Sequence, residues 1–160
     1  MRNITGKSIV LTFVLAFGAA SLLGAGAVNT SGTWKLNLQK SDYGKHPKPK
    51  DITVEVEHKE PSLKYTVTGT DGEGKSLNIQ FSGAIDGKDY PITGAPNNVA
   101  KVSAKRVNDT TTESVGKSAD GKVLENVTVT ISRDGKTLTR VAKVNGPDGE
   151  FTIKSVYDKQ

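Results

Sequence analysis

Five Asp-Gly pairs punctuate the chain and separate stretches in which apolar and polar residues alternate. Glycine and aspartate tolerate the positive φ angles of tight turns, so each pair favours a reversal of chain direction. Such pairs between alternating stretches are typical of β-hairpins. The sequence therefore predicts an antiparallel β-meander, with turns at Asp71-Gly72, Asp86-Gly87, Asp120-Gly121, Asp134-Gly135 and Asp148-Gly149.

The alternation also predicts which side chains are buried. Nine groups of turn residues divide the chain after residue 27 into about ten short strands, and no segment has the apolar spacing of a helix. An up-and-down β-barrel of eight to ten strands and a two-sheet β-sandwich both fit, because each buries one face of every strand. The residues expected to face one interior are Ile52, Val54, Val56, Tyr65, Val67, Ile79, Phe81, Val127, Val129, Ile131, Phe151 and Ile153.

The N-terminal residues have the composition of a secretory signal peptide. Arg2 and Lys7 precede an apolar stretch at 8–17, and Ala25-Gly26-Ala27 forms an A-x-A cleavage site. We expect residues 1–27 to be removed and residues 28–160 to form one domain, in a secreted or periplasmic protein. The chain contains no cysteine, so disulfides and lipid attachment to an N-terminal cysteine are excluded.

Charge and composition limit the expected partners. The net charge of +5 arises from cations and anions interspersed along the chain, which is typical of a solvated surface and not of a nucleic-acid interface. The single basic cluster, residues 45–50, contains prolines that indicate a stiff loop. We expect no nucleic-acid partner, no membrane span after cleavage, no cofactor and a monomer.

Catalytic and metal-binding motifs receive little support. The two histidines, His46 and His58, are not spaced to activate a nucleophile, and no H-E-x-x-H motif occurs. The Asp-Gly pairs lack the additional carboxylates of a calcium loop. We therefore expect neither an enzyme nor a metal site.

Both ends of the predicted domain resemble those of a known superfamily. Gly32-Thr33-Trp34 matches the G-x-W signature that opens the first strand of calycins, the superfamily of lipocalins and fatty-acid-binding proteins. Ser155-Val156-Tyr157 resembles the final strand of the fatty-acid-binding branch, which carries an R-x-Y element. A group of uncharacterised secreted bacterial proteins is similar over nearly the whole mature chain, including the segments Lys40-Ser41, Asp86 to Pro91, Asp134 to Thr139 and Val156-Tyr157.

The resemblance implies an exported barrel whose interior takes a small apolar or amphipathic ligand. The sequence departs from the fatty-acid-binding pattern in two places. Residues 42–50 form a short Pro-rich loop where that branch has a helical lid, and Ser155 stands where its carboxylate-binding arginine belongs. Trp34 is expected to plug the base of the barrel.

In a strand, a charged residue two positions away from an apolar residue points to the same face as that residue. Such charged residues are candidates for an inward orientation. A lone buried charge costs several kcal/mol, so each must pair, reach water or bind a ligand. We expect a salt bridge between Arg106 and Glu113. The five inward candidates are His58, Arg106, Glu113, Glu125 and Arg140.

The register of the last hairpin predicts where Arg140 lies relative to the C-terminal strand. If the last turn centres on residues 147 and 148, Arg140 lies opposite Ser155 and diagonal to Tyr157. This arrangement could hold a ligand carboxylate. The alternative is that the strands end or bulge here and the charges lie at a wet rim. The candidate ligand-binding residues are Arg140, Tyr157, Ser155 and Arg106.

Two functions remain open from the sequence. The first is a lipocalin-like barrel that binds a small hydrophobic or carboxylate ligand. The alternative is a structural or protein-interaction role in the cell envelope, with a filled interior. Small residues expected to face inward favour a cavity: Ala100, Ala104, Gly116, Ala142 and Ser155.

Overall fold

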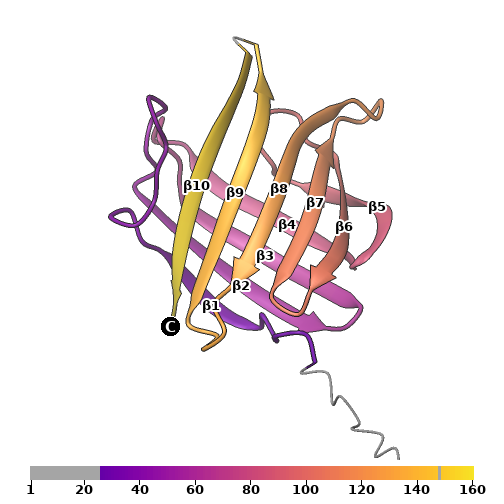
Figure 1. Ribbon diagram of the computed structural model, residues 1–160. Coiled ribbons are helices and arrows are strands. Elements are labelled where there is room, and N and C mark those ends of the chain that lie inside the picture. Colours follow the sequence, from indigo (N-terminus) through magenta and orange to yellow (C-terminus); the bar gives the residue numbers. More distant parts are fainter. Residues whose placement is uncertain (1–25, 148) are drawn as a thin grey trace, which may run out of the picture.

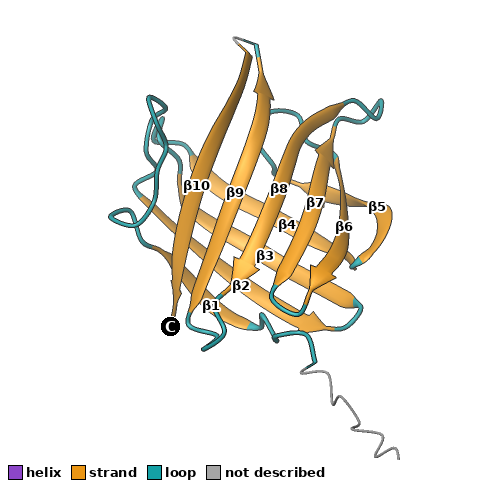
Figure 2. Cartoon of the chain, in the orientation of Figure 1, coloured by secondary structure: helices purple, strands orange, loops and turns teal. Residues whose placement is uncertain are grey.

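The chain forms a closed antiparallel β-barrel of ten strands (Figure 1). The computed structural model describes residues 26–147 and 149–160. Figure 2 shows strands and loops and no helix in this part of the chain. The strands are β1 (Gly32–Leu36), β2 (Asp51–Lys59), β3 (Ser62–Thr70), β4 (Ser76–Ala84), β5 (Asp86–Thr93), β6 (Lys101–Asn108), β7 (Thr111–Lys117), β8 (Val123–Ile131), β9 (Thr137–Gly146) and β10 (Gly149–Lys159).

Each strand pairs with the next in the sequence, and β1 pairs with β10 to close the barrel. The prediction of an up-and-down barrel is therefore confirmed over the sandwich. Backbone hydrogen bonds in both directions between Asp42 and Lys154 extend this seam beyond β1. We call the end that holds the N-terminal segment 28–31 the base, and the end with the β1–β2 loop and the β9–β10 turn the mouth (Figure 1).

The predicted turns are largely confirmed. The loop from Ser132 to Lys136 is representative: Asp134 Oδ1 accepts a hydrogen bond from the Lys136 N–H at 3.0 Å, and Gly135 has a φ of 70°. Similar loops contain Asp71 and Asp120. Gly149 pairs with Gly146 across the last turn, whereas Asp148 lies outside the described residues.

The expectation of a tight turn at Asp86-Gly87 is wrong. These residues belong to β5, where the register with β6 shifts between Asp86 and Asp89. Gly87, with a φ of 80°, takes the conformation that such a bulge requires. Within the described residues, β4 and β5 pair only at Gln80 with Thr93 and at Phe81 with Ile92. The reversal there is consequently wide.

The interior is lined by the side chains that alternation predicted. Strand registers place every residue of the predicted interior on the same face, from Val54 opposite Val67 to Ile153 opposite Ala142. At the base, Trp34 is completely buried and packs with Ile131, Leu138 and Tyr157. A second cluster surrounds Phe81, Val99 and Val102, and a third surrounds Val127, Ala142 and Val144.

The predicted signal peptide at residues 1–27 lies outside the described residues except for its last two. In the part of the chain that is described, no helix has the length and apolarity needed to cross a membrane.

Candidate functional site

A salt bridge inside the barrel is the first element of the candidate site. Arg140 of β9 donates from Nη2 to Glu125 Oε2 of β8 at 3.0 Å. Glu125 is opposite Val144, and Val129 is opposite Arg140, so the two charges are not direct cross-strand partners. Both side chains extend along the wall past the small, fully buried Ala142 to meet.

Glu125 also requires a small neighbour on the other side. Gly116 of β7 lies directly opposite Glu125. A Cβ atom at Gly116 would lie 2.6 Å from Glu125 Cγ, which is closer than real carbon contacts allow. The Glu125 side chain therefore occupies the space that the missing side chain of Gly116 leaves.

Tyrosine side chains surround this pair. The β1–β2 loop folds back and buries Tyr43, whose hydroxyl is 3.1 Å from Ser155 Oγ. Arg140 is directly opposite Ser155, as the hairpin register predicted. Burial raises the pKa of Tyr157, and the positive charge of Arg140 offsets part of this rise. Burial likewise raises the pKa of Tyr43.

Tyr65 of β3 lies on the opposite wall, and the charges of Arg140 and Glu125 both affect its pKa. Desolvation raises its pKa to about 12, while the charge of Arg140 lowers it and that of Glu125 raises it. Tyr65 nevertheless retains an accessible surface and is not part of the fully buried core.

Alkaline titration should reveal this environment. The folded-state pKa of Tyr65 is about 12 and the ordinary value is 10. The Tyr65 hydroxyl therefore stays protonated to a higher pH in the folded protein than in the unfolded chain. The contribution of Tyr65 to stability is therefore complete below pH 10 and is lost as the pH rises to about 12. Urea unfolding across this range should show a smaller loss of stability for Tyr65→Phe than for the wild type. Equal losses would contradict the assignment.

Arg106 belongs to a separate cluster near the base. Its Nη1 donates to Thr112 Oγ1 at 2.8 Å, and its Nη2 donates to Glu60. His58, also inward as predicted, has Nε2 at 3.1 Å from Glu60 Oε1. Partial burial alone would raise the pKa of Glu60, but hydrogen bonds from Arg106 and His58 and the positive charge of Arg106 lower it.

The predicted pairing of Arg106 with Glu113 is wrong. The inward positions of β7 are Thr112, Ser114 and Gly116, so Glu113 lies on the outer face. There it pairs with the Lys105 ammonium group at 3.6 Å. The apolar neighbour Val115 had suggested the opposite orientation, but it also faces outward.

The N-terminal segment crosses the base and contacts the same cluster. The Thr30 N–H donates to His58 Nδ1 at 3.3 Å. Ser31 Oγ donates to the His58 carbonyl at 3.1 Å, and the Val28 N–H donates to the Asp109 carbonyl at 2.8 Å. These bonds join the N-terminal segment to His58 and to Asp109 at the base.

The β1–β2 loop covers more of the mouth than we expected from a short Pro-rich loop. The β1–β2 loop has no helix, as expected, but it inserts Tyr43 into the interior. It also stacks His46 on Phe151, with ring centroids 3.9 Å apart. The loop thus covers part of the mouth of the barrel.

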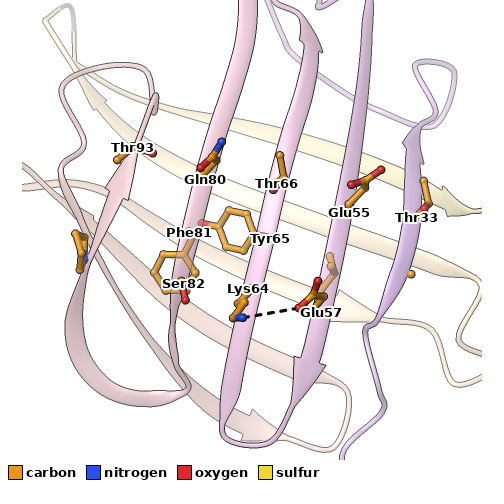
Figure 3. Close-up of a pocket in the computed structure, with 13 residues that line it drawn as sticks. Thr33, Glu55, Glu57, Lys64, Tyr65, Thr66, Gln80, Phe81, Ser82 and Thr93 are labelled. Atoms are coloured by element: carbon orange, nitrogen blue, oxygen red, sulfur yellow. Dashed lines mark ion pairs between the residues drawn. The ribbon is translucent and has the colours of Figure 1, made fainter.

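A hollow of about 530 Å³ lies on the outer face of β1 to β5 (Figure 3). Its row of polar side chains runs across the strands, each residue directly opposite the next. Figure 3 shows this row in front of Tyr65 and Phe81, together with the 4.0 Å ion pair between Lys64 and Glu57. The row consists of Thr33, Glu55, Thr66, Gln80 and Thr93.

The candidate ligand-binding residues are only partly brought together. Arg140, Ser155 and Tyr157 converge in the interior, whereas Arg106 binds Glu60 and His58 at the base. Tyr43 is a site residue that sequence reasoning missed. Its only signal was an aromatic residue within a polar, Pro-rich loop.

Comparison with known proteins leaves the resemblance to calycins as a prediction. No protein-family model matches the chain. No curated protein matches it significantly. Within residues 26–147 and 149–160, no three His, Asp or Glu side chains cluster in a way that could hold a metal ion.

Proposed function

We propose that the protein is a secreted or periplasmic barrel that binds a small apolar or amphipathic molecule in its interior. The observation that carries this proposal is the accessibility of the Arg140–Glu125 pair. Both side chains face inward, yet 32% of Arg140 and 21% of Glu125 remain exposed. In a closed barrel, an inward side chain meets water only from an internal space or an open end.

The wall opposite this pair supplies apolar surface. Most apolar inward side chains of β2 to β4 are only half-buried, whereas Phe81 of β4 belongs to the buried core. Apolar surface combined with a few convergent polar groups is typical of small-molecule sites. The half-buried residues are Ile52, Val54, Val56, Leu63, Tyr65, Val67, Leu77 and Ile79.

A structural role with a filled barrel is the second candidate. The small inward residues favoured a cavity in the sequence, but larger side chains lie against two of them, and these contacts support the second candidate. Tyr43 bonds to Ser155, and Glu125 lies against Gly116. If these contacts fill the interior completely, the barrel functions through its outer surface.

Native mass spectrometry of protein purified from its own host separates the two candidates. Copurification of a small molecule that is released on denaturation supports interior binding. Calorimetry with dodecanol as an amphipathic probe gives an independent measurement, and absence of both signals would favour the filled barrel. N-terminal sequencing of exported protein tests the location, with Val28 as the expected first residue.

Enlarging an inward side chain should block this binding. Ile79 is half-buried, faces inward and belongs to none of the three core clusters. We expect Ile79→Trp to weaken dodecanol binding by about tenfold or more, because the indole would occupy ligand space worth at least 1.4 kcal/mol. Asn78→Trp on the outer face is the matched control. Circular dichroism verifies that both variants fold, and equal affinities would argue against an interior site.

A further inference from the structure

We infer that Glu125 makes the interior site reject carboxylates and select molecules with an uncharged polar head group. This inference rests on the proposed binding of a ligand in the barrel. It concerns the ligand class, since Arg140 alone predicts a carboxylate ligand, whereas Arg140 paired with Glu125 does not.

The carboxylate of Glu125 already pairs with the guanidinium group of Arg140. Glu125 Oε2 accepts from Arg140 Nη2 at 3.0 Å, and Gly116 leaves the space that this side chain needs. A ligand carboxylate would have to displace Glu125 or share Arg140 with it. Two carboxylates around one cation repel each other, and the displaced one would lose its partner.

The surrounding groups suit an uncharged head. Burial raises the pKa of Tyr65 and of Tyr157, so both phenols are neutral at physiological pH. A neutral phenol can donate or accept a hydrogen bond. An alcohol, ester or amide can therefore bind beside the ion pair without adding charge, while its apolar portion contacts the half-buried side chains of β2 to β4.

Removing the charge of Glu125 should reverse the preference. We compare Glu125→Gln with the wild type by calorimetry at neutral pH, using dodecanoic acid and dodecanol as probes of equal chain length. The variant should bind dodecanoic acid about tenfold more tightly or better, the scale of a gained hydrogen bond to a charged group. Its affinity for dodecanol should stay within about threefold, because the apolar contacts are unchanged.

Glu113→Gln is the matched control. It removes the same charge from the adjacent strand, but Glu113 lies on the outer face and pairs with Lys105. This variant should leave both affinities unchanged. In the double variant Glu125→Gln/Arg140→Ala, the gain for dodecanoic acid should disappear, since no cation remains to hold it.

The outcomes separate the inference from the proposed function. If dodecanol binds but Glu125→Gln does not improve binding of dodecanoic acid, the inference is overturned while interior binding stands. Wild-type protein that binds dodecanoic acid more tightly than dodecanol also overturns it. If neither probe binds any variant, the proposed interior site itself fails.

Discussion

Replacing Trp34 with alanine is expected to lower the free energy of unfolding by about 3–5 kcal/mol, the range for deleting a buried aromatic side chain. Trp34 is completely buried and packs with Ile131, Leu138 and Tyr157 at the base. Its indole N–H also donates to the Thr30 carbonyl at 2.9 Å. The substitution therefore removes both the packing of the base and one of the hydrogen bonds that hold the N-terminal segment across it.

Urea unfolding followed by circular dichroism is the appropriate measurement, because Trp34 is the only tryptophan and its fluorescence is lost. Val107→Ala serves as the control, since Val107 is 49% exposed and should cost less than about 0.5 kcal/mol. Trp34→Phe should fall between the two. A loss for Trp34→Ala as small as that for Val107→Ala would show that the base is not a tightly packed plug.

Gly69→Ala is expected to cost about 2–4 kcal/mol, because backbone strain and overpacking add. Gly69 lies in β3 opposite Ile52 and has a φ of 141°, which L-residues rarely adopt. A Cβ atom there would lie 2.1 Å from the Asp51 carbonyl oxygen. Only glycine fits at this position of the β2–β3 pair without a shift of the backbone.

Gly74→Ala isolates the two contributions. Gly74 also has a positive φ, 85°, but an added Cβ would meet no atom within 4 Å. Its substitution should cost about 1 kcal/mol from backbone strain alone. If the midpoints of urea unfolding for the two variants agree, the close approach at Gly69 contributes nothing to stability.

Sequence periodicity predicted the barrel interior well because strand geometry fixes side-chain direction. Ile52, Val54 and Val56 point to one face whatever the neighbouring strand is. Register was predictable at Arg140 and Ser155 because a short turn determines which residues pair. The same local rules explain why His58, Glu125 and Arg140 were expected to face inward before any contact was known.

Where the local pattern was ambiguous, prediction failed. Glu113 was assigned inward because of Val115, yet the inward positions of β7 are small or polar, and the register shifts at both ends of this strand. The position of Tyr43 depends on Ser155, 112 residues away. The pairing of Arg140 with Glu125 likewise depends on the space at Gly116 and Ala142, which no local pattern describes.

The junction between β1 and β10 joins the first and the last strand of the barrel. Asn37 donates to Asp158 at 2.6 Å across a separation of 121 residues, while every other seam joins consecutive strands. Eight seams, from β1–β2 to β8–β9, can thus form before residues 149–159 are available, and β10 (Gly149–Lys159) then pairs with both β9 and β1. Until then the chain is an open sheet with two unpaired edges. Its final strand both completes the wall and protects the first strand from pairing with other molecules.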